Sequence, residues 1–458
     1  MPFGIDYAIG RRIIVLGAPV ILAMISQTSI NIIDTIFVGM LEGRVATAGQ
    51  SAIGISLPVY WGFGGFCSAL GIGTQALVAR RHGEHDPAAA GATLTNSLVL
   101  AVVLSAVFTT AGWFLLPAIF NAMHEDPTVR SLGVEYARIR FIGMVSMVAT
   151  FSYKAFYDGT ERTWVHLVAS LAMNAANIVL NIVLIFGKLG FPRLEVAGAG
   201  IASLAASFLG LAVMIAFTAR PGDLRRSRPY RPANVNHRTL WSIARLSLPS
   251  GLATAVVMTG FVAFLRIVAW IDDVPPGGGA VHTAATKIIM DVLSICFIGC
   301  LGLGTGTATL VSKSLGEKNP ELAERYGRDA LKIGAYLFGT IGLLEAVFPE
   351  AVLGIFTSDP RVIVAATPSM RLMGCVEGLM AAGIVATQCL FGAGNMKFVM
   401  YAEGILHFGL LIPLAYVLGV RLDLGMIGIW SAAAVYIVAL ASVMAIKFLA
   451  GGWKAIRI

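Results

Sequence analysis

Residues 71–87 read GIGTQALVARRHGEHDP, and residues 304–320 read GTGTATLVSKSLGEKNP. Eight of the seventeen positions are identical without a gap, and the two stretches lie 233 residues apart, about half of the 458-residue chain. The similarity runs from an apolar segment into the polar segment that follows, which chance similarity between apolar helices seldom does. Pro19, in LGAP, and Pro249, in LSLP, also stand near the start of each half. The sequence therefore predicts a duplicated chain.

Apolar segments long enough to cross a bilayer surround both copies of the repeat. The chain is 57% hydrophobic and 13% charged, whereas soluble domains are about 45–50% apolar and about 25% charged. A spanning helix needs about 20 apolar residues, and the segments do not alternate as the strands of a β-barrel do. The sequence therefore predicts an all-α membrane protein of about 12 transmembrane helices, with approximate spans at residues 12–40, 50–79, 92–119, 136–158, 165–187, 196–218, 241–271, 281–312, 328–355, 364–391, 398–420 and 425–449.

The longest polar segment lies at the middle of the chain. Residues 220–238 contain six arginines, and a linker between two half-domains is the natural interpretation. We expect an N-lobe at residues 1–218, a basic cytoplasmic linker at 219–240 and a C-lobe at 241–458. A patch that binds lipid headgroups is the alternative, although a solvated loop is favoured. Six spans per half give both halves the same orientation, a parallel repeat.

The distribution of basic residues predicts the orientation. If loops are assigned alternately, starting inside, 20 of the 33 lysines and arginines fall inside, 9 outside and 4 within spans. Basic residues are enriched on the cytoplasmic side of membrane proteins. We therefore expect a multi-pass protein of the bacterial inner membrane with both termini in the cytoplasm, and the formal charge of +8 does not indicate nucleic-acid binding.

Three features resemble the MATE family of multidrug and toxin extrusion antiporters. They are QTSINIIDTIFVG at residues 27–39, AMNAANIVLNIVLIFG at residues 172–187, and the two endings LVARRHGE and LVSKSLGE within the repeat. The resemblance covers essentially the whole chain. It implies two homologous six-helix lobes around a central cavity, and alternating-access export of organic, often cationic, compounds in exchange for protons or sodium.

Asp34 is the main candidate for a functional side chain. It lies deep in the first predicted span, where a carboxylate costs about 2.5–3.5 kcal/mol to insert. Gln27 and Asn31 share its helix face, because the spacing is i, i+4 and i+7. A cluster of hydrogen bonds between helices is the alternative. In the MATE resemblance, Asp34 matches the N-lobe aspartate that takes up and releases the coupling proton.

Three asparagines of the fifth predicted span also share one face. An asparagine cannot carry a transported proton, but it can hydrogen-bond Asp34; hydrogen bonding between helices is the alternative. The predicted cavity and hydrogen-bond network around Asp34 comprises Gln27, Asn31, Asn174, Asn177 and Asn181. Some MATE proteins carry an aspartate where Asn181 falls, so a site with two carboxylates is not expected here.

The C-terminal half offers secondary candidates, Lys287, Asp291 and Glu377. Lys287 and Asp291 share a face of the eighth predicted span, and an ion pair within the helix is the simplest interpretation. Some NorM-like MATE proteins carry cation-binding acids in the seventh and tenth spans, but residues 249–271 contain no acid. The resemblance is therefore closer to the DinF-like, proton-coupled branch. Glu345 is expected at or near the outer interface.

Several functions are not indicated. The chain has no G-x-x-x-x-G-K-[ST] motif and no C-x-x-C pair, so we expect no enzyme activity, catalytic residue, metal or cofactor. The coupling ion is expected to be a proton, with sodium as the alternative. Expected partners are small organic molecules and the lipid bilayer, with no nucleic acid, and a monomer is expected. A flippase for a lipid-linked precursor is the main alternative function; an intramembrane acyl or glycosyl transferase is a third.

Overall fold

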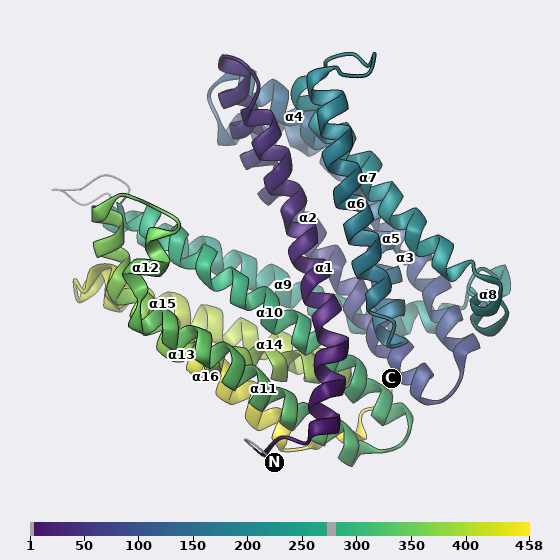
Figure 1. Ribbon diagram of the computed structural model, residues 1–458. Coiled ribbons are helices and arrows are strands. Elements are labelled where there is room, and N and C mark those ends of the chain that lie inside the picture. The colour runs from purple at the N-terminus through teal and green to yellow at the C-terminus, as the bar shows by residue number, and fades with distance from the viewer. Residues whose placement is uncertain (1–3, 273–280) are drawn as a thin grey trace. The chain divides into compact units, whose positions relative to one another are not determined.

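The computed structural model describes residues 4–272 and 281–458, and within them the chain forms helices, turns and loops without any strand (Figure 1). Eleven of these helices are long and apolar enough to cross a bilayer. Large apolar side chains lie exposed on them, for example Phe114 at 76% and Ile405 at 69%. Such surfaces suit lipid, where the backbone of a spanning segment must satisfy its own hydrogen bonds as a helix. The prediction of an all-α membrane protein is confirmed.

Residues 22–251 form one compact unit. It contains most of α1 (Tyr7–Gly39) and the beginning of α9 (His237–Asp272). Between them lie α2 (Arg44–Gly83), α3 (Pro87–Met123), α4 (Pro127–Ile142), α5 (Met144–Gly159), α6 (Trp164–Phe186), α7 (Glu195–Thr218), the short α8 (Pro221–Ser227) and the 3-10 turn η2 (Pro232–Asn234). We call this unit the N-half.

The fourth predicted span, residues 136–158, is two helices in the structure. Asp126 caps α4 by accepting a hydrogen bond from the Thr128 amide at 2.8 Å, so the helix begins nine residues before the predicted start. Gly143 separates α4 from α5, and a Cβ atom there would lie 2.9 Å from Leu204 Cδ1. Since each piece has only 16 residues, neither counts as a spanning helix by itself.

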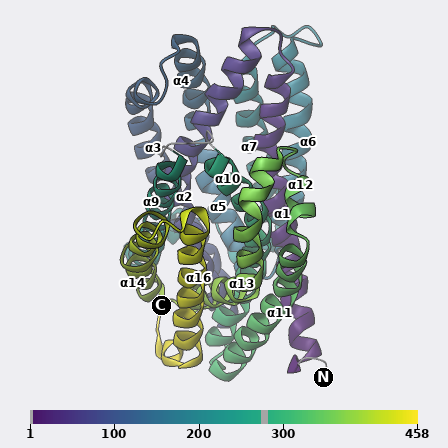
Figure 2. The same ribbon diagram turned by 90° about the vertical axis from the view of Figure 1, so that its left-hand side faces the viewer.

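The second compact unit contains the chain up to Ile21 and Leu252–Ile458. We call it the C-half. Its helices are α10 (Val281–Gly316), α11 (Pro320–Val347), α12 (Pro349–Gly354), α13 (Pro360–Gly392), α14 (Met396–Leu406), α15 (Ile412–Tyr416) and α16 (Gly425–Leu449), with π turns η3 (His407–Leu411) and η4 (Val417–Arg421) and the 3-10 turn η5 (Gly452–Ala455). Helix α13 packs against both α11 and α16 (Figure 2). The ninth predicted span, 328–355, is α11 and α12, because the chain breaks before Pro349.

The two copies of the repeat have the same local backbone. His85 and Lys318, which are 233 residues apart, both have a left-handed φ of 59°. The next residue caps the following helix in each case: Asp86 accepts from the Ala89 amide at 2.9 Å, and Asn319 from the Leu322 amide at 3.0 Å. A proline follows each cap and begins the helix, as is common at this position. The duplication therefore extends from sequence to conformation.

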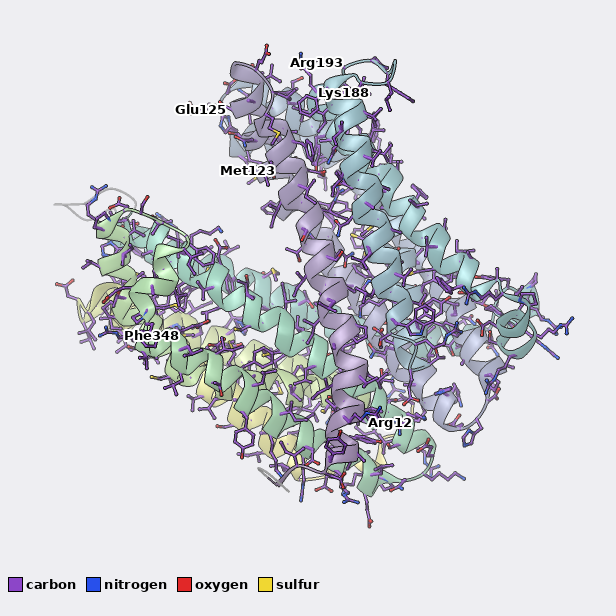
Figure 3. The ribbon with its side chains drawn as sticks, viewed as in Figure 1. Arg12, Met123, Glu125, Lys188, Arg193 and Phe348 are labelled. Carbon is purple, nitrogen blue, oxygen red and sulfur yellow. The ribbon has the colours of Figure 1, made fainter. Side chains whose placement is uncertain are left out.

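Charged side chains gather where the helices of the N-half end. Figure 3 shows Glu125, in the turn between α3 and α4, at the same end of this unit as Lys188 and Arg193 in the loop between α6 and α7. Polar residues are expected where helices leave the apolar layer of a membrane. The sequence assigns all three to one side of the membrane.

Candidate functional site

Asp34 is fully buried inside the N-half, where α1, α4, α6 and α7 meet. Asn177 and Asn181 of α6 both direct their side-chain amides to Asp34 Oδ1, at 3.0 and 2.8 Å. These asparagines are fully buried as well, and Asn181 Nδ2 also donates to Asn177 Oδ1 at 3.2 Å. The structure therefore brings together three of the residues that the sequence singled out.

The other carboxylate oxygen faces two hydroxyl groups that sequence reasoning missed. Ser203 of α7 donates to Asp34 Oδ2, and so does the Tyr136 hydroxyl of α4, at 3.3 Å. Asn177 Nδ2 also donates to Ser203 Oγ at 3.1 Å. A single serine or tyrosine in an apolar helix is common, so neither residue by itself indicates a functional site. Only the packing of α4 and α7 against α1 assigns them to the site.

The network accommodates Asp34 in either protonation state. As a carboxylate, Asp34 accepts four hydrogen bonds, from Asn177, Asn181, Ser203 and Tyr136. Donors to a buried carboxylate stabilise its charge. Among the described residues, no donor reaches Asn181 Oδ1, which is buried beside Asp34. A protonated Asp34 becomes a donor itself, and the hydroxyl groups of Ser203 and Tyr136, which can accept as well as donate, already contact its Oδ2.

Arg140, one helical turn after Tyr136 on α4, is a further residue near Asp34 that the sequence did not single out. Its guanidinium lies over the Tyr60 ring at 4.8 Å and interacts electrostatically with Asp34. Its Nε is buried without a hydrogen-bond acceptor in the described part of the chain. Because α4 begins at Pro127, Arg140 lies more than three turns into the helix. Arg140 can balance the charge of an ionised Asp34.

A pocket of about 60 Å³ adjoins Asp34 within the N-half. Its polar lining includes the predicted residues Gln27 and Asn31 together with Arg140 and Ser203, which also contacts Asp34. A water molecule needs roughly 10–15 Å³ of such space, so the pocket has room for water but not for a drug-sized molecule. Gln27 and Asn31 therefore lie beside the Asp34 network.

Asn174 lies outside this network. Its side-chain amide donates to the backbone oxygen of Ser26 at 2.5 Å and to the Ser26 hydroxyl. Asn174 therefore joins α6 to α1, one turn before Asn177. This contact is the hydrogen bonding between helices that the sequence left open as the alternative.

The three C-half candidates differ strongly in burial. Lys287 and Asp291 form an ion pair within α10 at 2.5 Å, with side chains 68% and 43% exposed. Glu377 of α13 is fully buried. One of its carboxylate oxygens lies within 4.8 Å of a carboxylate oxygen of Glu345 and of Cys296 Sγ. Neither glutamate forms an ion pair with a basic residue among those described. Glu377 and Glu345 are thus two uncompensated acids in one apolar core.

Glu345 is buried against α13, which the sequence did not predict. It lies in the last turn of α11, is 5% exposed and faces α13, and its expected position near the outer interface stays a prediction. Helices α11 and α13 approach closely at Gly342 and Gly374, and a Cβ atom on Gly342 would lie 2.7 Å from Glu377 Oε2. Because glycine has no side chain, the two helices can bring their glutamates together. The sequence shows both glycines but not that they face one another.

The sequence and fold were compared with known proteins. A chain described as a probable multidrug resistance protein NorM, from Thermotoga maritima, is 24% identical over 447 residues, covering 97% of this chain and 93% of that protein. Multidrug resistance protein MdtK of Pectobacterium atrosepticum is 24% identical and covers 89% and 87%. A crystal structure of MATE in the bent conformation matches with a TM-score of 0.87 at 22% identity, covering 96% of this chain and 95% of that one.

The family model described as MatE matches residues 19–183 and 245–417. These two segments account for most of the chain and fall one in each half of the repeat. The match and the structural similarity confirm the resemblance drawn from the sequence motifs. The chain belongs to the MatE family.

Proposed function

We propose that this protein is a secondary active antiporter of the inner membrane that exports organic, often cationic, compounds in exchange for protons. The observation that carries the proposal is Asp34, a fully buried carboxyl group whose surroundings supply donors for its ionised form and an acceptor for its protonated form. The names of the relatives, multidrug resistance proteins, support export as the activity.

Protonation of Asp34 would change how four helices are joined. The ionised carboxylate bonds α1 to α4, α6 and α7 through the side chains of Tyr136, Asn177, Asn181 and Ser203. When Asp34 is protonated it donates one hydrogen bond, so one partner must act as the acceptor; the hydroxyl groups of Ser203 and Tyr136 can do so, whereas an asparagine Nδ2 cannot. A bound proton shifts a conformational equilibrium only through its different affinity for the two states. The network provides such a difference, and alternating access would follow from it.

The proton gradient can supply the required energy. One proton moving inward gains about 1.4 kcal/mol per pH unit and about 2.3 kcal/mol per 100 mV of membrane potential. If one monovalent cation leaves for each proton that enters, no net charge moves, and only the pH term drives export. A neutral substrate would use both terms.

The first prediction concerns Asp34→Asn. The amide has nearly the shape of the carboxylic acid but cannot exchange a proton, so the variant should reach the membrane and lose proton-driven dye efflux by at least about tenfold. Ethidium efflux from cells at matched expression measures this loss. Glu350→Gln is the control, because it makes the same carboxyl-to-amide change at an exposed ion pair with Arg371 and should leave efflux unchanged. Wild-type efflux by Asp34→Asn that still stops with a protonophore would remove Asp34 from the mechanism.

The alternatives are less well supported. A flippase for a lipid-linked precursor is not favoured by relatives that are named multidrug resistance proteins, and those relatives are transporters, not enzymes. We infer a small-molecule substrate and a monomeric transporter that needs ion coupling and no cofactor. The DinF-like, proton-coupled assignment rests on the absence of an acid from residues 249–271 and stays a prediction; sodium is the alternative ion.

We also infer that Glu377 takes part in ion binding together with Glu345. Two ionised carboxylates this close in an apolar core repel one another at low dielectric, so the pair would take up a proton or a monovalent cation. The exposed pair of Lys287 and Asp291 is the weaker candidate, because surface ion pairs are common and contribute little.

Glu377→Gln and Glu345→Gln test this second site. Each variant removes one charge from the pair and should lower efflux several-fold, whereas Glu350→Gln should not, because Glu350 is 68% exposed and pairs with Arg371 at 3.6 Å. Efflux measured separately under a pH gradient and a sodium gradient identifies the ion. Three variants that all transport like the wild type would exclude the pair from coupling.

A further inference from the structure

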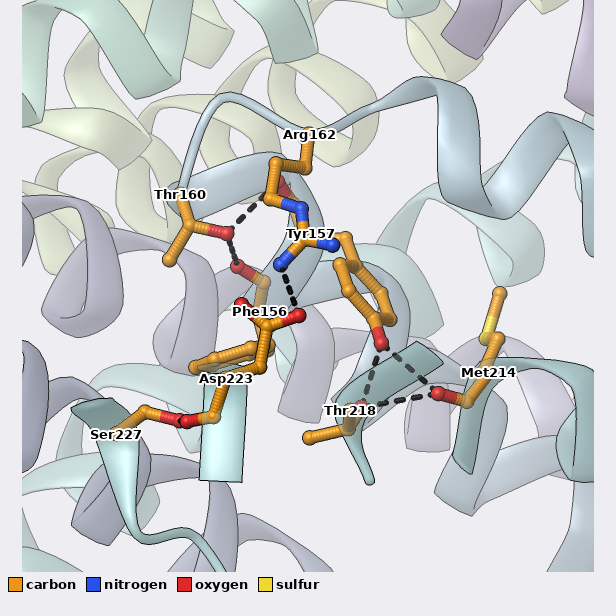
Figure 4. Close-up of polar contacts among 8 residues, drawn as sticks. All are labelled: Phe156, Tyr157, Thr160, Arg162, Met214, Thr218, Asp223 and Ser227. Carbon is orange, nitrogen blue, oxygen red and sulfur yellow. Dashed lines mark hydrogen bonds and ion pairs between the residues drawn. The ribbon is translucent and has the colours of Figure 1, made fainter. Parts of the chain in front are cut away.

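The segment between α7 and α9 is an ordered part of the N-half. Arg162 Nη1 donates to Asp223 Oδ2 of α8 at 2.8 Å (Figure 4). Farther along, Asn96 of α3 holds the segment twice: its Nδ2 donates to the Asn234 carbonyl at 2.8 Å, and its Oδ1 accepts from the Asn236 amide at 2.9 Å. The segment predicted as a linker is therefore bonded to α3 and to the residues that precede α6.

Two close contacts fix the middle of this segment. Gly91 of α3 lies so near Ser227 that a Cβ atom at Gly91 would clash with the Ser227 carbonyl. The hydroxyl groups of Tyr153 and Tyr230 are hydrogen-bonded at 3.0 Å. Because the backbone is held at these points as well as at Asp223 and Asn234, the arginines between Asp223 and Asn234 project from defined positions.

Three of these arginines surround one cavity. It has a volume of about 510 Å³ and is lined by Leu224, Arg225, Arg228, Tyr230 and Arg231. No carboxylate in the described part of the chain forms an ion pair with the three arginines, and the nearby Asp223 is already bonded to Arg162. Guanidinium groups bind phosphate oxygens in a bidentate manner. The cavity therefore presents unpaired positive charge suited to an oxyanion.

Aromatic residues place this cavity at the depth of the lipid headgroups. Helix α7 ends at Thr218, and Arg220 lies over the Phe217 ring at 4.1 Å. Trp164, at the start of α6, packs edge-on against Phe217 at 5.2 Å and is 43% exposed, and Trp241, in the first turns of α9, is 62% exposed. Exposed tryptophans at helix ends mark the boundary between the membrane and water.

We propose that this arginine pocket binds the headgroup phosphate of an anionic phospholipid. Arg225, Arg228 and Arg231 contact the phosphate, while Leu224 and Tyr230 give the cavity an apolar wall that a soluble phosphate ion would not need. Basic clusters next to a spanning helix attract anionic lipids. The inference adds a lipid site to the N-half and does not depend on the transport activity.

Thermal unfolding of the full-length protein in neutral detergent tests the site. A ligand that binds the folded state raises Tm with its concentration. Short-chain phosphatidylglycerol should raise Tm by several degrees, whereas phosphatidylcholine with the same chains and inorganic phosphate at the same concentration should not. Arg228→Gln/Arg231→Gln should abolish the rise. The control, Arg226→Gln/Arg238→Gln, removes the same charge from exposed arginines that do not line the cavity and should keep it.

Two results would overturn the proposal. An equal rise with inorganic phosphate would show an anion site without a lipid, and an equal loss in the control variant would show attraction by net charge alone. If the double variant does not fold, Arg225→Gln serves instead, because Arg225 is exposed on α8 and lines the same cavity. An unchanged response in that variant would contradict the site as well.

Discussion

Arg140 shows how a single side chain changes the interpretation of a buried site. The Asp34 network alone could be a hydrogen-bond cluster that joins four helices. A guanidinium that interacts electrostatically with Asp34 and also lines the adjoining pocket adds a charge that responds to the state of the carboxyl group. A purely structural cluster would not need this charge, and placing it in an apolar helix layer is costly.

Arg140→Gln therefore has a specific expected effect. The variant removes a positive charge that can balance an ionised Asp34, so efflux should fall several-fold. Arg138→Gln is a matched control two residues away, because Arg138 lies over the Trp113 ring at 4.7 Å and not in the pocket. Dye efflux at equal expression compares them. Equal transport by both variants would leave Arg140 with no part in the site.

Several helices end at positions that the spans predicted from the sequence do not show. Gly143 divides the fourth predicted span, and Pro349 separates α12 from α11. The turn that ends each copy of the repeat has one residue in the left-handed region, His85 or Lys318, although neither is a glycine. A left-handed conformation costs a non-glycine residue roughly 1–2 kcal/mol. The same strain therefore occurs at matching positions of the two halves.

Substitutions at His85 should reveal this strain. His85→Gly should raise Tm slightly, because glycine adopts a φ of 59° without steric cost. His85→Val should lower Tm, since a β-branched residue at positive φ is a true outlier. Thermal unfolding in detergent distinguishes them, and the two changes should have opposite signs. Shifts of the same sign would mean that the left-handed backbone does not limit stability here.

For the whole molecule, the orientation in the membrane follows from charge. The 20 basic residues assigned inside and 9 outside predict cytoplasmic termini. Figure 3 shows the predicted outer segments of the N-half, with Glu125, Lys188 and Arg193, at one end of that unit. The N-half and the C-half divide within α1, after Ile21, and within α9, after Gly251, and not at the linker.

Reporter fusions test the orientation. A fluorescent protein that matures only in the cytoplasm should be bright when fused after Ile458, and alkaline phosphatase should be active when inserted after Lys188. The reverse pattern would place both termini outside. An active phosphatase after Lys188 together with a dark fluorescent protein after Ile458 would contradict an even number of spans.

The sequence alone predicts the membrane class, the duplication and the grouping of Asp34, Asn177 and Asn181 as candidate site residues. These follow from composition, internal similarity and helical spacing, which are local properties of the chain. Only the tertiary structure decided that Tyr136, Ser203 and Arg140 join the site, that Glu345 meets Glu377, and that the polar segment after α7 is bonded to α3. The physical reason is that each of these depends on which faces of distant helices pack together. Spacing within one helix does not specify that choice.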